Sequence, residues 1–389
     1  MAPKAAPKNC AATPKTKVTS AIVKKTPPIR AVKPLTYGCD FAGLGTMSLA
    51  IKRNAQLCPS AFVPHHLFSC DNLPASEAFI RVTSNPVAFH KDILTRTDAD
   101  LPDSLDLYSW TSPCQGLSSA GCQLGAKDPR TKLLFKSIEF IRKVKPKAFI
   151  MENVPMLATF AKNKDLWQTI LGELTACGYK IEHAVVNTSD YLPQNRARLY
   201  AVGLRNDVKR TNAKGVPVFP TPPPRRILTL KDIIQVLPSD KWAPFPDQKA
   251  NKLAYSNVVN AYRSLPAGVN PFLTPVVVDA RSSARFSSSR TGEFPTLTKT
   301  RSSQFGYWVS TKGGWVSLAE LAALQGYFGD DFPVASAHIS KAQAGGMLGN
   351  SQSLPLVQDL LAHTMYHAQL LTYDQFMVTK RAMYASWGF

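Results

Sequence analysis

The spacing of apolar residues changes along the chain, and its first change is the most informative. Residues 35–37 alternate as in a strand, residues 38–45 contain three glycines, and apolar side chains then recur at helical spacing from Met47 to Ile51. This order predicts a strand, a glycine turn and a helix. Such a turn lets the backbone approach a ligand closely, and taken alone it would equally suit a dinucleotide.

Two later apolar runs end in polar or glycine-rich segments. Residues 67–70 predict a strand that ends in Asp71, where an acid typically binds ribose hydroxyls. Residues 106–110 predict a short strand, and the glycines and serines of residues 116–125 predict a loop after it. Because α/β enzymes keep their chemistry in loops that follow parallel strands, we expect a site at these strand ends. The pattern favours an α/β fold with a mostly parallel, doubly wound sheet.

Two segments lack regular patterning. Residues 205–290 contain many prolines, which predict an irregular, loop-rich module. Residues 1–35 are rich in alanine, lysine, proline and threonine without apolar periodicity, which predicts a disordered basic tail. We therefore expect residues 36–204 and 340–389 to form a large domain and residues 205–339 a smaller one.

Composition narrows the class of protein. With 389 residues and 44% hydrophobic content, the chain can bury a sizeable core in one to three domains. No apolar run approaches the roughly 18 residues of a membrane helix, so a soluble protein is expected. The seven cysteines are odd in number and form no Cys-x-x-Cys pair, which argues against a zinc site or a disulfide framework. No metal is expected.

The positive charge is concentrated in two segments. Residues 1–39 contain eight basic residues and no acidic ones, and residues 205–312 contain 17 basic and 6 acidic residues. These segments account for nearly all of the net charge of +20. The concentration indicates a polyanionic partner, whereas an even spread would fit charge that only keeps the surface soluble.

Candidate chemistry lies in short blocks in a fixed order. Cys114 stands between Pro113 and Gln115, and such a cysteine is by itself more often a small buried hydrophobe than a nucleophile. The neighbouring blocks change this interpretation. In chain order the blocks are Phe41-Ala42-Gly43-Leu44-Gly45, His90-Lys91-Asp92-Ile93, Pro113-Cys114-Gln115, Glu152-Asn153-Val154, Gln194-Asn195-Arg196-Ala197-Arg198 and Gly349-Asn350-Ser351.

Together these blocks resemble those of the cytosine-5 DNA methyltransferases, over roughly residues 36–370. The resemblance implies a Rossmann-like, S-adenosylmethionine-dependent methyltransferase fold with a target-recognition domain in the smaller, irregular part. It further implies S-adenosyl-L-methionine as the methyl donor, cytosine-containing duplex DNA as the partner, and catalysis by a monomer. In this family the first block lies under the methionine part of the cofactor, and the last block returns to it. The residues expected at the cofactor are Phe41, Gly43, Leu44, Gly45, Asp71, Asp92, Ile93, Pro113, Asn350 and Ser351.

The expected catalytic residues fit methylation of a carbon that is a poor nucleophile. C5 of cytosine reacts once covalent attack at C6 has added electrons to the ring, and the Cys114 thiolate would make that attack. Glu152 would engage N3, with a pKa raised by burial. Arg196 and Arg198 would clamp the base and its backbone, alternating like strand neighbours with one facing the pocket. Singly, the glutamate would also fit a loop carboxylate and the arginines a surface salt bridge.

DNA contacts are expected from the loop after Cys114 and from the basic module. The loop is expected to close over a base flipped out of its stack. Arginines spread among serines suit contacts with phosphates and grooves. The residues expected to contact DNA are Gln115, Ser118, Arg281, Arg285, Arg290 and Arg301.

Two other functions stay open. One branch of the family methylates transfer RNA and typically has a Cys-Phe-Thr signature near the end of the recognition region. This chain has Thr296-Leu297-Thr298 there, so DNA is favoured. The other is a catalytically silent DNA-binding relative, which would usually lack the nucleophile, the glutamate or the first-block glycines that this chain retains.

The chain departs from the family pattern at two places. Where relatives often have an acid two residues before the first-block phenylalanine, this chain has Cys39, and Asp40 lies one place later. Near Glu320, which together with Leu324-Gln325-Gly326-Tyr327 resembles a family landmark, the usual arginines are replaced by Gly314 and Ala319. The departures put one cofactor contact and the local packing of the recognition domain in question.

The basic tail would serve as a nonspecific DNA arm, a nuclear address or an organellar transit peptide. Transit peptides favour arginine and serine over lysine and proline, so we expect a nuclear protein. An organelle and a bacterial or viral cytoplasm are the alternatives.

Overall fold

A seven-stranded sheet organises the chain from Val32 onward in the computed structural model, which describes residues 1–2, 32–113 and 131–389. The strand order is β3-β2-β1-β4-β5-β7-β6, and within these ranges every neighbouring pair is parallel except those that involve β7. The predicted mostly parallel α/β sheet is therefore confirmed. Its strands are β1 (Pro34–Asp40), β2 (Val63–Cys70), β3 (Ala88–His90), β4 (Leu107–Trp110), β5 (Ala148–Asn153), β6 (Tyr179–Asn187) and β7 (Ala197–Arg205).

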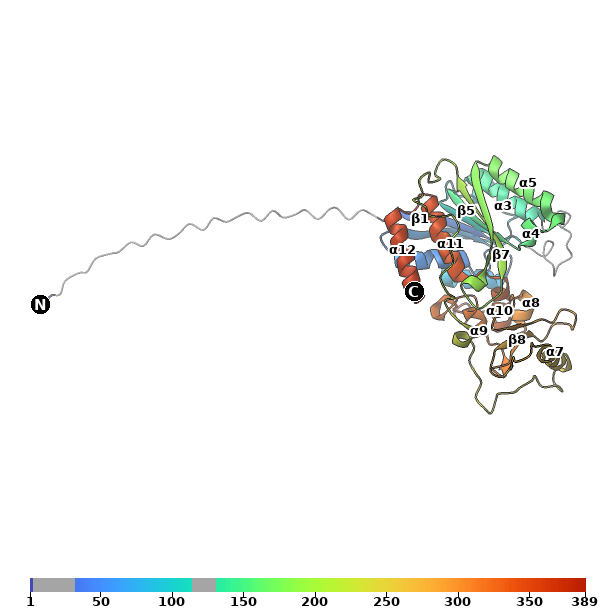
Figure 1. The fold of residues 1–389 in the computed structure, drawn as a ribbon. Coiled ribbons are helices and arrows are strands. Elements are labelled where there is room, and N and C mark those ends of the chain that lie inside the picture. The colour runs from blue at the N-terminus through green and yellow to red at the C-terminus, as the bar shows by residue number, and fades with distance from the viewer. Residues whose placement is uncertain (3–31, 114–130) are drawn as a thin grey trace. The chain divides into compact units, whose positions relative to one another are not determined.

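Strand side chains alternate between two cores, one on each face of the sheet. On β5, Ile150 faces the first core and Phe149 the second; on β7, Val202 and Ala201 do the same. Helices cover both faces, with α11 and α12 on one side and α3 and α5 on the other (Figure 1). These helices, with the others of the large sheet, are α1 (Thr46–Leu57), α2 (Pro74–Thr83), α3 (Thr131–Val144), α4 (Met156–Thr159), α5 (Lys164–Ala176), α11 (Leu354–His367) and α12 (Tyr373–Ser386). Single 3-10 turns lie at Asp98–Asp100, Ala161–Asn163, Thr188–Asp190 and Gly329–Asp331.

The C-terminal helices return to the first face of the sheet. Every residue of α11 is buried, which fits a helix that is apolar around most of its circumference and packed on several sides. Its Gln358 carbonyl accepts a hydrogen bond of 3.1 Å from the Asn54 amide of α1. This contact joins the end of the chain to the helix that follows the glycine turn. Within residues 32–113 and 131–389, no helix is long and apolar enough to cross a membrane.

A second, antiparallel sheet lies in the basic part of the chain. Among the described residues it has four strands in the order β11-β10-β8-β9. On β8, Val276 and Val278 pack toward α7, whereas Val277 faces the core of the large sheet. The elements of this part are α6 (Leu230–Ile233), α7 (Lys252–Arg263), β8 (Val276–Asp279), β9 (Ser289–Thr291), α8 (Lys299–Ser303), β10 (Tyr307–Val309), β11 (Gly314–Trp315) and α9 (Leu318–Ala323), and α10 (Lys341–Asn350) follows it in the chain.

The segment before α6 packs on the large sheet's helices. The Pro217 carbonyl lies 2.7 Å from His363 Nδ1 of α11, and the Ile227 amide donates to the Tyr191 carbonyl at 2.7 Å. After α9, the Tyr327 hydroxyl lies 2.6 Å from Thr46 Oγ1 of α1. We therefore propose that the smaller domain comprises the part between α6 and α9, inside the range 205–339 expected from the sequence.

A buried ion pair joins the turn between β10 and β11 to α9. The Lys312 ammonium lies 2.6 and 2.7 Å from the two carboxylate oxygens of Glu320, and both side chains are almost fully buried. The backbone amides of Gln235 and Ser317 also donate to this carboxylate. Lys312 thus supplies a cation beside Glu320, where the sequence analysis found the family's arginines replaced.

Lys312→Met is expected to lower the free energy of unfolding by about 3–5 kcal/mol, because it leaves the Glu320 carboxylate buried without its cation. Urea denaturation followed by tryptophan fluorescence measures the change. Lys241→Met, at an exposed lysine of the same part of the chain, is the matched control and should stay within about 0.5 kcal/mol of the parent. A Lys312→Met variant as stable as this control would contradict the assigned role.

Candidate active site

A cavity of about 490 Å³ opens where the carboxyl ends of β1, β2, β4 and β5 meet. The chain leaves β1 toward β2 on one side and returns to β4 on the other, so the cavity lies at the switch point of the sheet, where α/β folds bind ligands. Its wall contains predicted residues from all six sequence blocks, together with Asp71, which lies outside the blocks. They are Phe41, Gly43, Leu44, Gly45, Asp71, Asp92, Ile93, Pro113, Glu152, Arg196, Arg198, Asn350 and Ser351.

The turn after β1 has a backbone that most residues avoid. Phe41, Gly43 and Gly45 have φ of 56°, 54° and 67°, and for Phe41 this left-handed conformation is strained. The Thr111 hydroxyl holds Phe41 in place by donating to its carbonyl at 2.7 Å. A Cβ atom built on Gly43 would meet no atom within 4 Å, so the turn faces open space that a ligand can fill.

Two acids follow the neighbouring strands. Asp71 accepts hydrogen bonds from the Gly43 amide at 2.8 Å and the Leu73 amide at 3.0 Å, and burial raises its pKa against the opposing effect of these bonds. Since a carboxylate accepts about four hydrogen bonds, Asp71 keeps capacity for a ligand hydroxyl. Asp92 is exposed and accepts from the Leu94 amide at 2.9 Å.

Glu152 and Arg198 form an ion pair inside the cavity. Arg198 Nε lies 3.1 Å from Glu152 Oε1, and the side chains are 17% and 11% exposed. The strand register explains the contact: Glu152 lies opposite Tyr200 on β7, and Arg198 shares a face with Tyr200 because it is two residues away. Burial raises the pKa of Glu152, and the positive charges of Arg198 and then Arg196 oppose the rise.

Arg196 lines the same cavity but binds backbone. Its Nη1 donates to the carbonyls of Leu297 at 2.8 Å and Gly349 at 3.2 Å. Both arginines therefore line the cavity, whereas the alternation of strand side chains predicted that one of them would face it. A Cβ atom at Gly349 would lie 2.4 Å from the Thr298 carbonyl, so only glycine allows α10 this close to the start of α8.

The segment that leads to the predicted nucleophile is held from β5. The Asn153 amide donates to the Ser112 carbonyl at 3.3 Å and to its hydroxyl at 3.2 Å. The next residue, Pro113, lines the cavity beside Glu152. Cys114, Gln115 and Ser118 lie outside the described residues, as do the other predicted loop residues up to position 130.

Sequence reasoning missed Lys299, which lines the cavity from the first turn of α8. Burial raises the pKa of Asp71, and the positive charge of Lys299 opposes this rise, as hydrogen bonds to the carboxylate do more strongly. Lys299 belongs to none of the six blocks, and its place depends on the close approach of α8 to α10. The basic charge of residues 205–312 was the one signal that pointed to this region.

The four arginines predicted to contact DNA do not line the cavity. Arg301 lies with Nε 2.6 Å from Asp279 Oδ1, and Arg281 donates to the Gln304 carbonyl at 2.7 Å and covers the Trp315 ring. Arg290 Nη1 lies 3.4 Å from a Glu293 oxygen, and exposed Arg285 lies over the ring of Phe286. Arg301 also donates to the Gln304 side-chain oxygen at 3.0 Å and to the Ser282 hydroxyl at 3.1 Å, so protein groups engage it more extensively than the other three.

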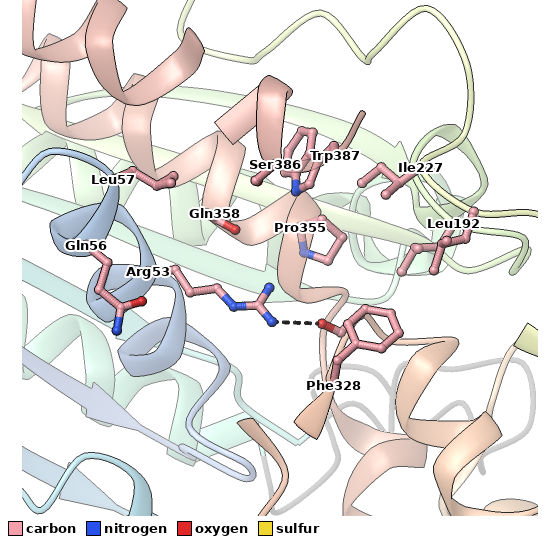
Figure 2. A pocket seen from close by; sticks show the side chains of 12 residues that line it. Arg53, Gln56, Leu57, Leu192, Ile227, Phe328, Pro355, Gln358, Ser386 and Trp387 are labelled. Atoms are coloured by element: carbon pink, nitrogen blue, oxygen red, sulfur yellow. Dashed lines mark hydrogen bonds between the residues drawn. The ribbon is translucent and has the colours of Figure 1, made fainter. Parts of the chain in front are cut away.

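A second cavity, of about 480 Å³, lies between α1, α11 and the end of α12 (Figure 2). Leu57, Phe328, Pro355 and Trp387 give it a largely apolar wall. Arg53 donates to the Gly326 carbonyl at 3.3 Å, the bond drawn in Figure 2, and also pairs with Asp331. None of the predicted site residues that the structure describes lies on this wall. The cavity at the switch point is therefore the candidate active site.

The chain matches known proteins over most of its length. Residues 41–365 match the sequence model described as C-5 cytosine-specific DNA methylase. The Type II methyltransferase M.NlaX of Neisseria lactamica is 38% identical over 152 residues, 38% of this chain and 45% of that protein. M.NgoPII of Neisseria gonorrhoeae is 27% identical over 285 residues, 70% of this chain and 80% of that protein. The match covers about half, or less, of the length of several such relatives.

The fold is shared with a solved structure of low sequence identity. The Entamoeba histolytica methyltransferase EhMeth has a TM-score of 0.56 at 13% identity, over 86% of this chain and 98% of that chain. The family match extends over most of the chain and includes all six blocks that contribute to the cavity. The chain belongs to the C-5 cytosine-specific DNA methylase family.

Proposed function

We propose that the chain is a DNA (cytosine-5)-methyltransferase that acts on a cytosine flipped out of its stack. The observation that supports this function best is the single cavity that joins the glycine turn to the Glu152–Arg198 pair and to Pro113, the residue before Cys114. A ligand on the turn and a base at the pair would therefore lie next to each other in one cavity.

The cofactor side of the cavity fits S-adenosyl-L-methionine, on which the family depends in general. The volume lies in the range of about 300–1,000 Å³ that is common for small-molecule sites. The turn at residues 41–45 would lie under the methionine part, Asp71 would accept from ribose hydroxyls, and Asp92 would meet the adenine amino group. When bound, this cofactor supplies an electrophilic methyl group.

Residues on the base side of the cavity are proposed to activate the cytosine ring and to stabilise the charge that develops on it. The Cys114 thiolate forms a bond to C6, and the ring electrons move toward C5 while protonated Glu152 donates a hydrogen bond at N3. The contact with Arg198 holds the Glu152 side chain in position on the base side of the cavity. After C5 has gained the methyl group, a water molecule accepts the C5 proton, the electron pair of that C–H bond restores the C5–C6 double bond, and Cys114 leaves C6 as a thiolate.

The basic segment from 205 to 312 supports a nucleic-acid partner. Arg281, Arg285 and Arg290 are proposed to face DNA, whereas Arg301 is engaged by Asp279. The nuclear location stays a prediction from the basic tail. The monomeric state stays a prediction as well.

Methyl transfer to duplex DNA is expected to exceed transfer to transfer RNA, since the Cys-Phe-Thr signature of the RNA-methylating branch is absent from the sequence at 296–298. Incubation with radiolabelled S-adenosyl-L-methionine and either nucleic acid measures the difference. Bisulfite sequencing of the DNA product locates the methylated cytosines. Transfer to RNA alone would overturn the proposed substrate.

A further inference from the structure

Asp40, the last residue of β1, faces away from the core that the preceding residues of the strand fill. Leu35, Tyr37 and Cys39 point into the core with α1 and α11, and strand alternation turns Asp40 to the other face. There its buried carboxylate accepts hydrogen bonds from Arg96 Nη1 and Nη2, both at 2.8 Å, and from the Tyr108 hydroxyl at 2.6 Å. The displaced acid in the sequence is therefore one end of a bidentate ion pair.

Arg96 reaches this acid from another segment of the cavity wall. It follows β3 in the chain, four residues after Asp92 and three after Ile93, both of which line the cavity. Its guanidinium lies against two aromatic rings that also contact each other, 5.0 Å from the centroid of Phe68 and 4.7 Å from that of Phe140. Only 4% of the Arg96 side chain and none of the Asp40 side chain are exposed. The bidentate contact with Asp40 inside this buried setting restrains the orientation of the guanidinium.

The pair joins the two segments expected to hold opposite ends of the cofactor. Asp40 precedes Phe41, whose left-handed conformation costs on the order of 1–3 kcal/mol and persists only if neighbours fix it. A bidentate arginine–carboxylate pair fixes both distance and orientation, which apolar contacts do not. The segment at residues 91–96 is thereby tied to the start of the glycine turn.

We propose that Arg96 is a positioning residue: through Asp40 it holds the glycine turn at residues 41–45 and the Asp92–Ile93 segment at the separation that the cofactor requires. The inference rests on the proposed function in that S-adenosyl-L-methionine is the ligand. The competing explanation is that the pair serves stability alone. A buried ion pair can often be replaced by apolar residues of similar volume without loss of stability. Such a replacement separates the two explanations, because it removes the ion pair and leaves the fold stable.

The test compares the parent chain with Asp40→Leu/Arg96→Met and with Arg96→Lys. Calorimetry measures binding of S-adenosyl-L-methionine and of S-adenosylhomocysteine, and thermal unfolding measures stability. The double variant is expected to unfold near the parent temperature and to bind both ligands at least about tenfold more weakly. Arg81→Met, at an exposed arginine of α2 that also pairs with an acid and lies over a ring, is the matched control and should bind as the parent does.

Arg96→Lys keeps the charge and loses the fork, so it tests the geometry even if the double variant fails to fold. It is expected to raise KM for the cofactor about tenfold while kcat at saturating cofactor stays close to the parent value. Parent-like cofactor affinity in either folded variant overturns the positioning role. A parent chain that binds neither ligand overturns the proposed cofactor instead, so the two failures are distinguishable.

Discussion

Cys114→Ser is expected to abolish methyl transfer and to leave cofactor binding close to that of the parent chain. A serine hydroxyl stays protonated near neutral pH, whereas a thiol ionises readily enough to attack an electron-poor ring. Loss of a covalent nucleophile costs kcat on the order of 10⁴–10⁶-fold. Radiolabelled methyl transfer to duplex DNA measures turnover, and calorimetry with S-adenosyl-L-methionine measures binding.

DNA that contains 5-fluorocytosine turns the same substitution into a test of the covalent step. The C5 fluorine cannot leave as a proton does, so the bond from sulfur to C6 persists after methyl transfer. The parent chain should form an adduct that survives denaturation, and Cys114→Ser should form none. Cys177→Ser, at a buried cysteine that ends α5 outside the cavity wall, is the matched control and should form the adduct.

Two outcomes would contradict this assignment. Cys114→Ser with the parent's methylation rate would rule out this cysteine as the nucleophile. A parent chain that binds DNA with salt-sensitive affinity and forms no adduct would be a catalytically silent binding protein, the alternative left open by the sequence.

The part of the site that follows regular elements was predictable from sequence. The glycine turn and Asp71 follow β1 and β2, and apolar runs of the right period located both of them. Glu152 on β5 was found by its block, Glu152-Asn153-Val154, and not by periodicity. Parallel strands bring their carboxyl ends to one edge, and this turns positions far apart in the chain into neighbours. The structure adds that Asn350 and Ser351 reach this edge from the end of α10.

The contacts of the irregular part were not predictable. Lys312 with Glu320 and Arg301 with Asp279 each join residues that lie in different elements or turns, so the period of no single helix or strand brings them together. A segment without apolar periodicity also does not indicate which hydrophobic core it joins. The residues between β7 and α6 are an example, because they pack on α11 and not in the smaller domain. The position of Asp40 was a partial signal, because its shift by one place put one cofactor contact in question. Strand alternation turns its side chain to the face of the sheet opposite the core with α1 and α11.

Glu152→Gln is expected to lower kcat by about 10²–10⁴-fold, because the amide keeps the shape of the side chain and loses the proton that the carboxyl group shares with N3. Glu182→Gln, at a partly exposed glutamate of β6 that does not line the cavity, is the matched control and should keep the parent rate. Single-turnover methylation of duplex DNA measures the chemical step directly. A Glu152→Gln rate equal to that of the control would remove Glu152 from the mechanism.

The pH dependence of the methylation rate tests which protonation state of Glu152 is active. Burial raises the pKa of Glu152, and the charges of Arg198 and Arg196 oppose the rise. Because the protonated carboxyl group is the active form, the parent rate should fall as the pH rises through this raised pKa, and Glu152→Gln should lack that fall. Arg198→Gln removes the nearest opposing charge, so the fall should move to higher pH even though the maximal rate is lower. A fall that stays at the parent pH in Arg198→Gln, or that persists in Glu152→Gln, would assign the titration to another group.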